Sequence, residues 1–236
     1  MSLLEISGLE VAYGVQRVIR GISLTIKEGE FAALVGPNGH GKTTVLRAIS
    51  GLARARAGEI RLDGKALTRA RPDRIVAAGI IHVPQGDLLF PGMSVLDNLR
   101  MGAYLPEAAR DEARRLDEVF TLLPKLRDRQ TQTASTLSGG ERRMVGIGRG
   151  LMAGGRILML DEPSLGLAPI VIDQIYELVQ ALAKSGRTIL VVEENAIRIA
   201  DMADRMHLLD NGAIAWSGTG QEFLSSPEIF ATYLGG

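Results

Sequence analysis

An eight-residue stretch, GPNGHGKT at residues 36–43, has the residue types and spacing of a phosphate-binding loop. Its glycines let consecutive backbone N–H groups curl around a phosphate, and the following helix adds its positive N-terminal end. Lys42 is expected to reach the terminal phosphates, and the Thr43 hydroxyl can ligate Mg²⁺. His40 stands at a variable position, where it is either tolerated or senses phosphate. The predicted nucleotide-binding residues are Gly36, Pro37, Asn38, Gly39, His40, Gly41, Lys42, Thr43 and Thr44.

Two carboxylates, Asp161 and Glu162, follow the apolar stretch ILML at residues 157–160, which is typical of a buried strand. Side chains alternate along a strand, so the two carboxylates are expected to point in different directions. Asp161 could then reach Mg²⁺, directly or through water, and Glu162 could polarise an attacking water. Phosphoryl transfer to water needs both roles. An acidic cap on the next helix is the structural alternative, and the phosphate-binding loop weakens it.

A second phosphate-binding helix end is indicated by LSGGE, residues 137–141. Ser138 and Glu141 have the spacing of a capping box, which is a purely structural explanation. That explanation does not account for the two glycines, because glycine lowers helix propensity. Two such ends cannot easily grip one γ-phosphate unless two chains pair head to tail. The residues predicted to form this second phosphate-binding end, which would serve a partner chain, are Leu137, Ser138, Gly139, Gly140 and Glu141.

The elements that must position these residues alternate between strand and helix, which predicts an α/β fold. Continuous apolar runs predict parallel strands at 31–35, 157–160 and 188–192. Alternating patterns predict antiparallel strands at 3–26, an edge hairpin at 58–64, and a final hairpin that turns at 210–212. Residues from about 90 to 155 are helical in pattern, and a further helix is expected at 169–184.

These elements predict one domain over residues 1–236: a P-loop core with a mostly parallel sheet, an antiparallel β edge subdomain and an inserted α-helical subdomain. The core and β subdomain are expected at about 1–88 and 156–236, and the helical subdomain at about 89–155.

Composition limits the possible functions. Lys+Arg and Asp+Glu both count 27, which argues against a broad nucleic-acid-binding face. The absence of cysteine excludes disulfides and thiolate metal sites. No apolar run approaches the roughly 18 residues needed to span a bilayer, so any membrane connection is expected to go through a partner.

The ordered motifs resemble those of the nucleotide-binding subunit of an ABC transporter, over essentially the whole chain. The resemblance implies an ATPase that uses ATP and Mg²⁺, with Tyr13 stacked on adenine. It implies that Gln85 senses Mg²⁺ and water and moves with the membrane partner. SLGLAP, at 164–169, would be the loop by which two ATPase subunits touch. The implied catalytic residues are Glu162, Lys42, Gln85 and Glu194, and the implied metal ligands are Thr43, Gln85 and Asp161.

Finer details are similar to the shorter ATPase of branched-chain amino acid importers: PSLGLAP, LFPGMSVLDNLRMGAY and VVEENA. Members of that group often have Glu where this chain has Gln85, and close relatives handle urea or short amides. The resemblance implies a homodimer, or a heterodimer with a second ABC ATPase, bound to integral-membrane permease subunits. A periplasmic or extracellular solute-binding protein would act indirectly, and the chain would lie peripherally on the cytoplasmic face of the inner or plasma membrane.

Glu194 departs from the family pattern. Other ABC ATPases usually have a switch histidine there, and this group commonly has an amide residue. An ionised carboxylate cannot donate a hydrogen bond and would repel the γ-phosphate. Glu194 could therefore point away, with water or Asn195 making the contact, or it could be protonated. Alternatively, hydrolysis is weak until a partner chain supplies a better residue.

Two other classes of protein fit the motifs less well. A non-transport ABC ATPase acting on nucleic acid or ribosomes typically has paired ATPase domains or a long coiled coil, whereas this chain has one copy of each motif and no sustained heptads. A small-molecule kinase would use the phosphate-binding loop but gives no reason for LSGGE.

Overall fold

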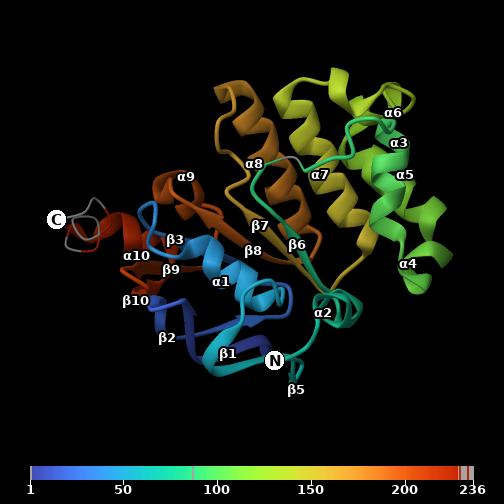
Figure 1. Ribbon diagram of the computed structural model, residues 1–236. Helices are drawn as coiled ribbons and strands as arrows, with labels where there is room; N and C mark the ends of the chain where they lie inside the picture. Colours follow the sequence, from blue (N-terminus) through green and yellow to red (C-terminus); the bar gives the residue numbers. More distant parts are fainter. Residues whose placement is uncertain (1, 87, 228, 230–232, 234–236) are drawn as a thin grey trace.

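Two β-sheets form the frame of the molecule (Figure 1). The computed structural model describes residues 2–86, 88–227, 229 and 233. The four-stranded antiparallel sheet contains, in spatial order, β2 (Gln16–Lys27), β1 (Ser2–Tyr13), β4 (Ala55–Leu62) and β5 (Lys65–Ala66). The six-stranded sheet contains, in spatial order, β10 (Ala213–Gly218), β9 (Arg205–Asp210), β3 (Phe31–Val35), β8 (Thr188–Glu193), β7 (Ile157–Asp161) and β6 (Ile80–Val83).

The six-stranded sheet is parallel except at one edge, where β10 pairs antiparallel with β9. Every residue of β3, β7 and β8 is buried, as expected of parallel strands covered on both faces. The predicted strands and the predicted hairpin at 210–212 are confirmed. The predicted α/β class with an antiparallel edge is therefore also confirmed.

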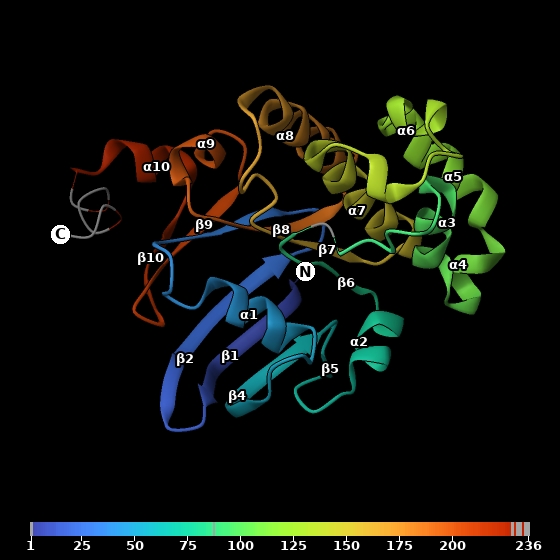
Figure 2. The ribbon, with the colours of Figure 1, turned by 45° about the horizontal axis from the view of Figure 1, so that its top comes forward.

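The helices cover both faces of the six-stranded sheet. Helix α1 (Lys42–Ile49) lies between the two sheets (Figure 2), where Val45 and Leu46 pack with apolar residues of both. The opposite face packs against α8 (Pro169–Lys184) and the helices of the region expected to be helical. These are α3 (Val95–Arg100), α4 (Pro106–Arg110), α5 (Glu112–Leu122), α6 (Pro124–Asp128) and α7 (Gly139–Ala153). Shorter helices complete the fold: α2 (Pro72–Ala78), α9 (Ala196–Ala200) and α10 (Gly220–Ser225).

Alternation along the buried strands separates two hydrophobic cores. Ala32 and Leu34 of β3 face α1 and the antiparallel sheet, whereas Phe31, Ala33 and Val35 face α7 and α8. Both faces of β3 are therefore fixed by packing, which holds the loop after it in one place. Among the described residues, no helix is long and apolar enough to cross a membrane.

A candidate nucleotide-binding site

The phosphate-binding loop connects the end of β3 to the start of α1, as the sequence predicted. Two of its glycines are required by close packing and by positive φ angles. A Cβ atom at Gly36, whose φ is 152°, would lie 2.2 Å from the carbonyl oxygen of Leu209 on β9. A Cβ atom at Gly41, whose φ is 105°, would lie 2.6 Å from Ile19 Cδ1 on β2. The loop is therefore shaped by both sheets.

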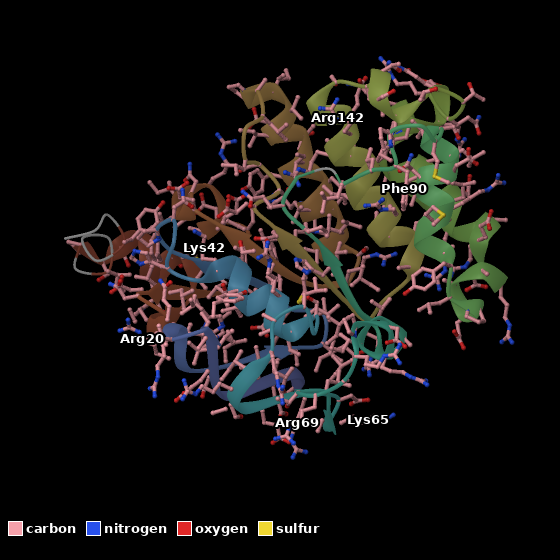
Figure 3. All side chains as sticks on the ribbon, viewed as in Figure 1. Arg20, Lys42, Lys65, Arg69, Phe90 and Arg142 are labelled. Carbon is pink, nitrogen blue, oxygen red and sulfur yellow. The ribbon has the colours of Figure 1, made fainter. Side chains whose placement is uncertain are left out.

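Lys42 is the first residue of α1 (Figure 3), and its side chain is buried. Its Nζ donates hydrogen bonds to the carbonyl oxygens of Gly36, at 2.8 Å, and Pro37, at 3.1 Å. It also lies 3.4 Å from Glu162 Oε1. The ammonium is thus held where a bound phosphate would meet the backbone N–H groups of the loop.

Asp161 and Glu162 receive different partners, as their alternation along the chain predicted. Asp161, at the end of β7, accepts a hydrogen bond from the Thr43 hydroxyl at 3.0 Å. Glu162 accepts one from Gln85 Nε2 at 3.2 Å. Burial raises the pKa of the Asp161 carboxyl, and the negative charge of Glu162 adds to that rise. A divalent cation beside Asp161 would favour its ionised form.

A cavity of about 260 Å³ brings many of the predicted residues together. Its lining includes six loop and helix residues named from the sequence, the two partners Gln85 and Glu162, and one residue of β2: Asn38, Gly39, Gly41, Lys42, Thr43, Thr44, Gln85, Glu162 and Val18. The volume and the lining fit a chain of phosphates. Adenine would extend beyond it, because the lining is polar and contains no aromatic side chain.

Other predicted residues lie outside this cavity. Tyr13 is half exposed at the end of β1. His40 contacts the turn between β9 and β10 instead: its Nδ1 lies 3.0 Å from Asp210 Oδ1 and accepts a hydrogen bond from the Asn211 N–H. The sequence did not predict this contact between the loop and the β9–β10 turn.

The two adjacent acids after β8 have opposite environments. Glu193 is buried and pairs with Val35, and its carboxylate accepts a hydrogen bond from the Ser164 N–H at 3.3 Å. Burial raises the pKa of the Glu193 carboxyl. Glu194 is exposed and does not line the cavity, and Asn195 caps α9 through a hydrogen bond from the Arg198 N–H. The buried acid is therefore Glu193, which sequence reasoning had not singled out.

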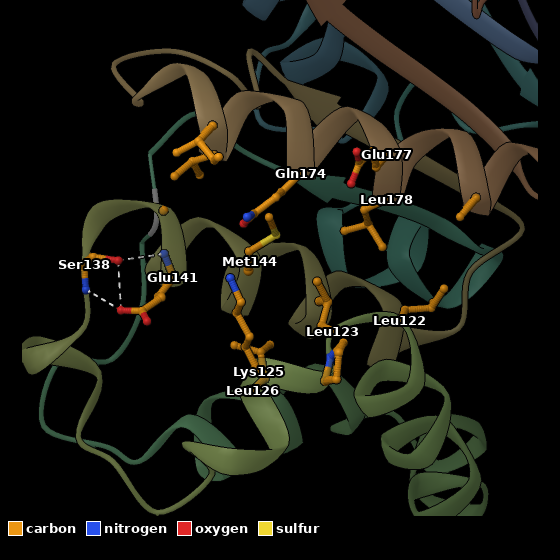
Figure 4. A pocket seen from close by; sticks show the side chains of 15 residues that line it. Leu122, Leu123, Lys125, Leu126, Ser138, Glu141, Met144, Gln174, Glu177 and Leu178 are labelled. Atoms are coloured by element: carbon orange, nitrogen blue, oxygen red, sulfur yellow. Dashed lines mark hydrogen bonds between the residues drawn. The ribbon is translucent and has the colours of Figure 1, made fainter.

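The LSGGE segment begins α7 with the predicted capping box. The Ser138 hydroxyl accepts a hydrogen bond from the Glu141 N–H, and the Glu141 carboxylate accepts one from the Ser138 N–H at 2.9 Å. Beside it lies a larger cavity of about 780 Å³ between α6, α7 and α8 (Figure 4). Its lining is mostly apolar and contains no residue of the phosphate-binding loop. Figure 3 shows Arg142, near the start of α7, well apart from Lys42. The two predicted phosphate-binding ends are therefore separate within one chain.

The donor set fits a magnesium ion that is shared with a nucleotide. In the part of the chain that the structure describes, no group of three or more His, Cys, Asp and Glu residues could hold a metal alone. Thr43 and Asp161 do meet through their oxygens, and Gln85 lines the same cavity. One hydroxyl, one carboxylate and one amide leave positions for phosphate oxygens, which is how proteins usually bind Mg²⁺.

Comparison with known proteins agrees with this geometry. Residues 19–165 match the family model of the ABC transporter, a region that contains both the phosphate-binding loop and LSGGE. The chain belongs to the ABC transporter ATP-binding family. It is 39% identical over 234 residues to the high-affinity branched-chain amino acid transport ATP-binding protein BraG of Pseudomonas aeruginosa, covering 99% of this chain and 100% of BraG.

Two further ABC relatives have different roles in their names. A probable branched-chain amino acid transport ATP-binding protein, LivF of Archaeoglobus fulgidus, is 36% identical and covers 92% of both chains. The lipopolysaccharide export system ATP-binding protein LptB of Haemophilus influenzae is 32% identical, covering 100% of this chain and 98% of LptB.

A solved ABC transporter ATP-binding cassette in its ADP conformation has the same fold. It has a TM-score of 0.88 and 26% identity, with both chains covered fully. This ABC protein is therefore an ATP-binding ATPase subunit of a transporter. Such subunits work as dimers with membrane permease partners.

Proposed function

We propose that this ABC ATPase hydrolyses Mg²⁺–ATP at the cavity beneath the phosphate-binding loop, as the motor subunit of an importer for branched-chain amino acids. The observation behind this proposal is that Lys42 and Gln85 both contact Glu162. Lys42 would bind phosphate, and Gln85 would sense the metal and water. Among the described residues that line this cavity, Glu162 is the only acid.

Each residue then has a defined task. Lys42 moves from the loop carbonyls to the β- and γ-phosphates, and the loop N–H groups hold the same oxygens. Glu162 accepts a hydrogen bond from the attacking water and takes up its proton. Mg²⁺, held by Thr43, Asp161 and Gln85, would neutralise charge that develops on the phosphate oxygens.

The active form is proposed to be a head-to-tail dimer. The start of α7 has two glycines whose backbone can approach a phosphate, but none of residues 137–141 lines the cavity of its own chain. A second chain can supply this helix end to the cavity, whereas the same chain cannot without rearrangement. Tyr13 would stack on the adenine, and residues 164–169 would lie at the contact between subunits.

The solute is proposed from the relatives. Two of them are named for branched-chain amino acid transport, and BraG aligns over its full length. Urea or short amides remain the alternative within the same group of importers. Export of lipopolysaccharide is favoured less, because LptB is less similar than BraG. The chain would bind the cytoplasmic face of the membrane through its permease.

The decisive experiment identifies the partners. The tagged chain is purified from its native cell in mild detergent, and the accompanying proteins are identified by mass spectrometry. We expect a permease and a solute-binding protein, and we expect the solute-binding protein to bind leucine, isoleucine or valine in a direct binding assay. A binding protein specific for urea or amides would change the solute alone. Recovery of lipopolysaccharide export proteins would contradict the import function.

A further inference from the structure

His82 is a buried histidine beside the predicted metal ligand, and none of the roles above uses it. It lies on β6, where it pairs with Met159 of β7, and its side chain is only 7% exposed. Its Nδ1 lies 3.1 Å from the Ser50 hydroxyl at the end of α1. Its Nε2 has no hydrogen-bond partner and lies 4.0 Å from Asp161 Oδ2. A buried polar atom without a partner is costly, so its position calls for an explanation.

The groups around His82 determine which of its two ring nitrogens carries the proton. Burial, together with the positive charge of Arg47, lowers the pKa of His82 to about 4, so one ring nitrogen carries a proton at neutral pH and the other accepts. A lone pair on Nε2 would face the Asp161 carboxylate and be repelled. The Ser50 hydroxyl has one proton and two acceptors within reach, the Leu46 carbonyl oxygen at 2.8 Å and His82 Nδ1 at 3.1 Å. Donation to Leu46 would put the ring proton on Nδ1 and leave the Nε2 lone pair against the Asp161 carboxylate, whereas donation to Nδ1 puts the ring proton on Nε2, toward the carboxylate. The favoured arrangement has the proton on Nε2.

We propose that His82 is a positioning residue for Asp161, whose carboxylate it orients toward the metal through its Nε2–H. This inference rests on the proposed Mg²⁺–ATP site. Thr43 already fixes Oδ1 of the carboxylate, and His82 approaches its other oxygen, Oδ2. A movement of about 1 Å would bring Nε2 and Oδ2 to hydrogen-bond distance. Ser50, His82 and Asp161 then form a relay from the end of α1 to the metal ligand, in the manner of groups that orient ligands in other metal sites.

The first test measures the affinity for Mg²⁺ without hydrolysis. Binding of a fluorescent ATP analogue is titrated with Mg²⁺ in wild type and in His82→Phe, which fills the same space without a donor. We expect the variant to need about 10-fold or more Mg²⁺ for half-saturation. Binding of the analogue in EDTA should be the same in both proteins, because His82 does not touch the phosphate-binding loop. His82→Gln restores a neutral donor and should recover part of the lost Mg²⁺ affinity.

His207 provides a matched control. It is also a buried histidine with a serine at Nδ1, Ser217 at 2.7 Å, and an Nε2 atom without a partner. Burial lowers its pKa to about 4 as well. It lies on β9 rather than beside Asp161, so His207→Phe should leave the Mg²⁺ requirement unchanged. Equal losses of Mg²⁺ affinity in His82→Phe and His207→Phe would reduce the role of His82 to packing and overturn the proposal.

A second measurement needs no variant. Nitrogen-15 NMR of the histidine side chains in the nucleotide-free wild type reports which ring nitrogen carries the proton. We expect Nε2–H for His82; an Nδ1–H tautomer would contradict the relay. Asp161→Asn separates failure of this inference from failure of the site. If Asp161→Asn weakens Mg²⁺-dependent binding and His82→Phe does not, only the inference fails. If neither does, the proposed metal site fails as well.

Discussion

Glu162 occupies a backbone conformation that few non-glycine residues adopt. Its φ is 43°, which costs roughly 1–2 kcal/mol for an L-residue. Its N–H donates to the Val192 carbonyl oxygen at 2.9 Å, and its carboxylate is held by Lys42 and Gln85. Three contacts thus hold a residue that would otherwise relax. Strain of this kind persists where the surrounding structure determines the position of one side chain, as at a reacting centre.

Replacing Glu162 with glutamine tests its role as the base. Glu162→Gln keeps the shape of the side chain but cannot take up a proton, so ATP turnover should fall by about 10²–10⁴-fold. ATP binding should persist, and a nucleotide-bound dimer should accumulate in size-exclusion chromatography. Glu177→Gln, an exposed glutamate on α8, is the matched control and should turn over normally. Near-normal turnover in Glu162→Gln would remove it from this role.

Glu194 gives a second test at the residue scale. The structure favours the account in which it points away from the γ-phosphate, because the residue is exposed and does not line the cavity. Glu194→Gln should therefore leave the pH dependence of ATP turnover unchanged. The comparison uses steady-state rates measured from roughly pH 5.5 to 8.5, because protonation of a catalytic group changes the rate within this range. If the substitution flattens a rise toward acid pH, a protonated Glu194 is the donor after all.

Glu193 should destabilise the fold at neutral pH. Burial raises its pKa in the folded chain above the unfolded value, so the folded state binds the proton more tightly. The free-energy cost of ionising the buried Glu193 carboxyl is absent below the unfolded pKa. It grows as pH rises toward the folded pKa and is complete above it. Glu193→Gln should therefore raise the melting temperature at pH 7 and lose that advantage near pH 4. Thermal unfolding across this range checks the sign, and an advantage that is greater at acid pH would contradict it.

At the scale of elements, local pattern predicted the strands whose burial is continuous. The positions of β3, β7 and β8 were predictable because each contains an unbroken apolar run. β6 was missed, since its four residues include His82 and are followed at once by Pro84. Its burial comes from α7, far along the chain: a Cβ atom at Gly150 would lie 2.6 Å from Val83. Contacts distant in sequence cannot be inferred from a local pattern.

The same limit applies to the site. The spacing of the motifs predicted Lys42, Asp161 and Glu162, because phosphate binding depends on residue types in a fixed order. Spacing could not decide which of Glu193 and Glu194 is buried, since that depends on the residue at which β8 ends. It also could not pair Gln85 with Glu162, which are 77 residues apart.

Gly102 offers a test of the packing between the turn that follows α3 and helix α7. It is buried in the turn that follows α3 and packs against α7, where a Cβ atom would lie 2.0 Å from the Arg149 carbonyl oxygen. Gly102→Ala must displace α7, and we expect a loss of about 1–3 kcal/mol in the free energy of unfolding. Gly92→Ala is the control, because its Cβ meets nothing within 4 Å. Urea unfolding measures both; equal stability of the two variants would contradict this packing.

At the scale of the whole molecule, the separation of the two phosphate-binding ends predicts complementation between chains. Lys42→Ala removes the phosphate ligand of the loop. Gly139→Asp puts negative charge at the start of α7, where a Cβ atom meets nothing closer than 3.8 Å, so the chain itself should still fold. Each variant alone should lack ATP turnover. In a head-to-tail homodimer, a mixed pair keeps one intact composite site out of two, so doubly tagged mixed dimers should recover about half of wild-type turnover. Mixed dimers of Lys42→Ala with Lys42→Ala carry the same tags and should stay inactive. An absence of recovery in purified mixed pairs would exclude a composite site between identical chains and point to a second ABC ATPase as the working partner.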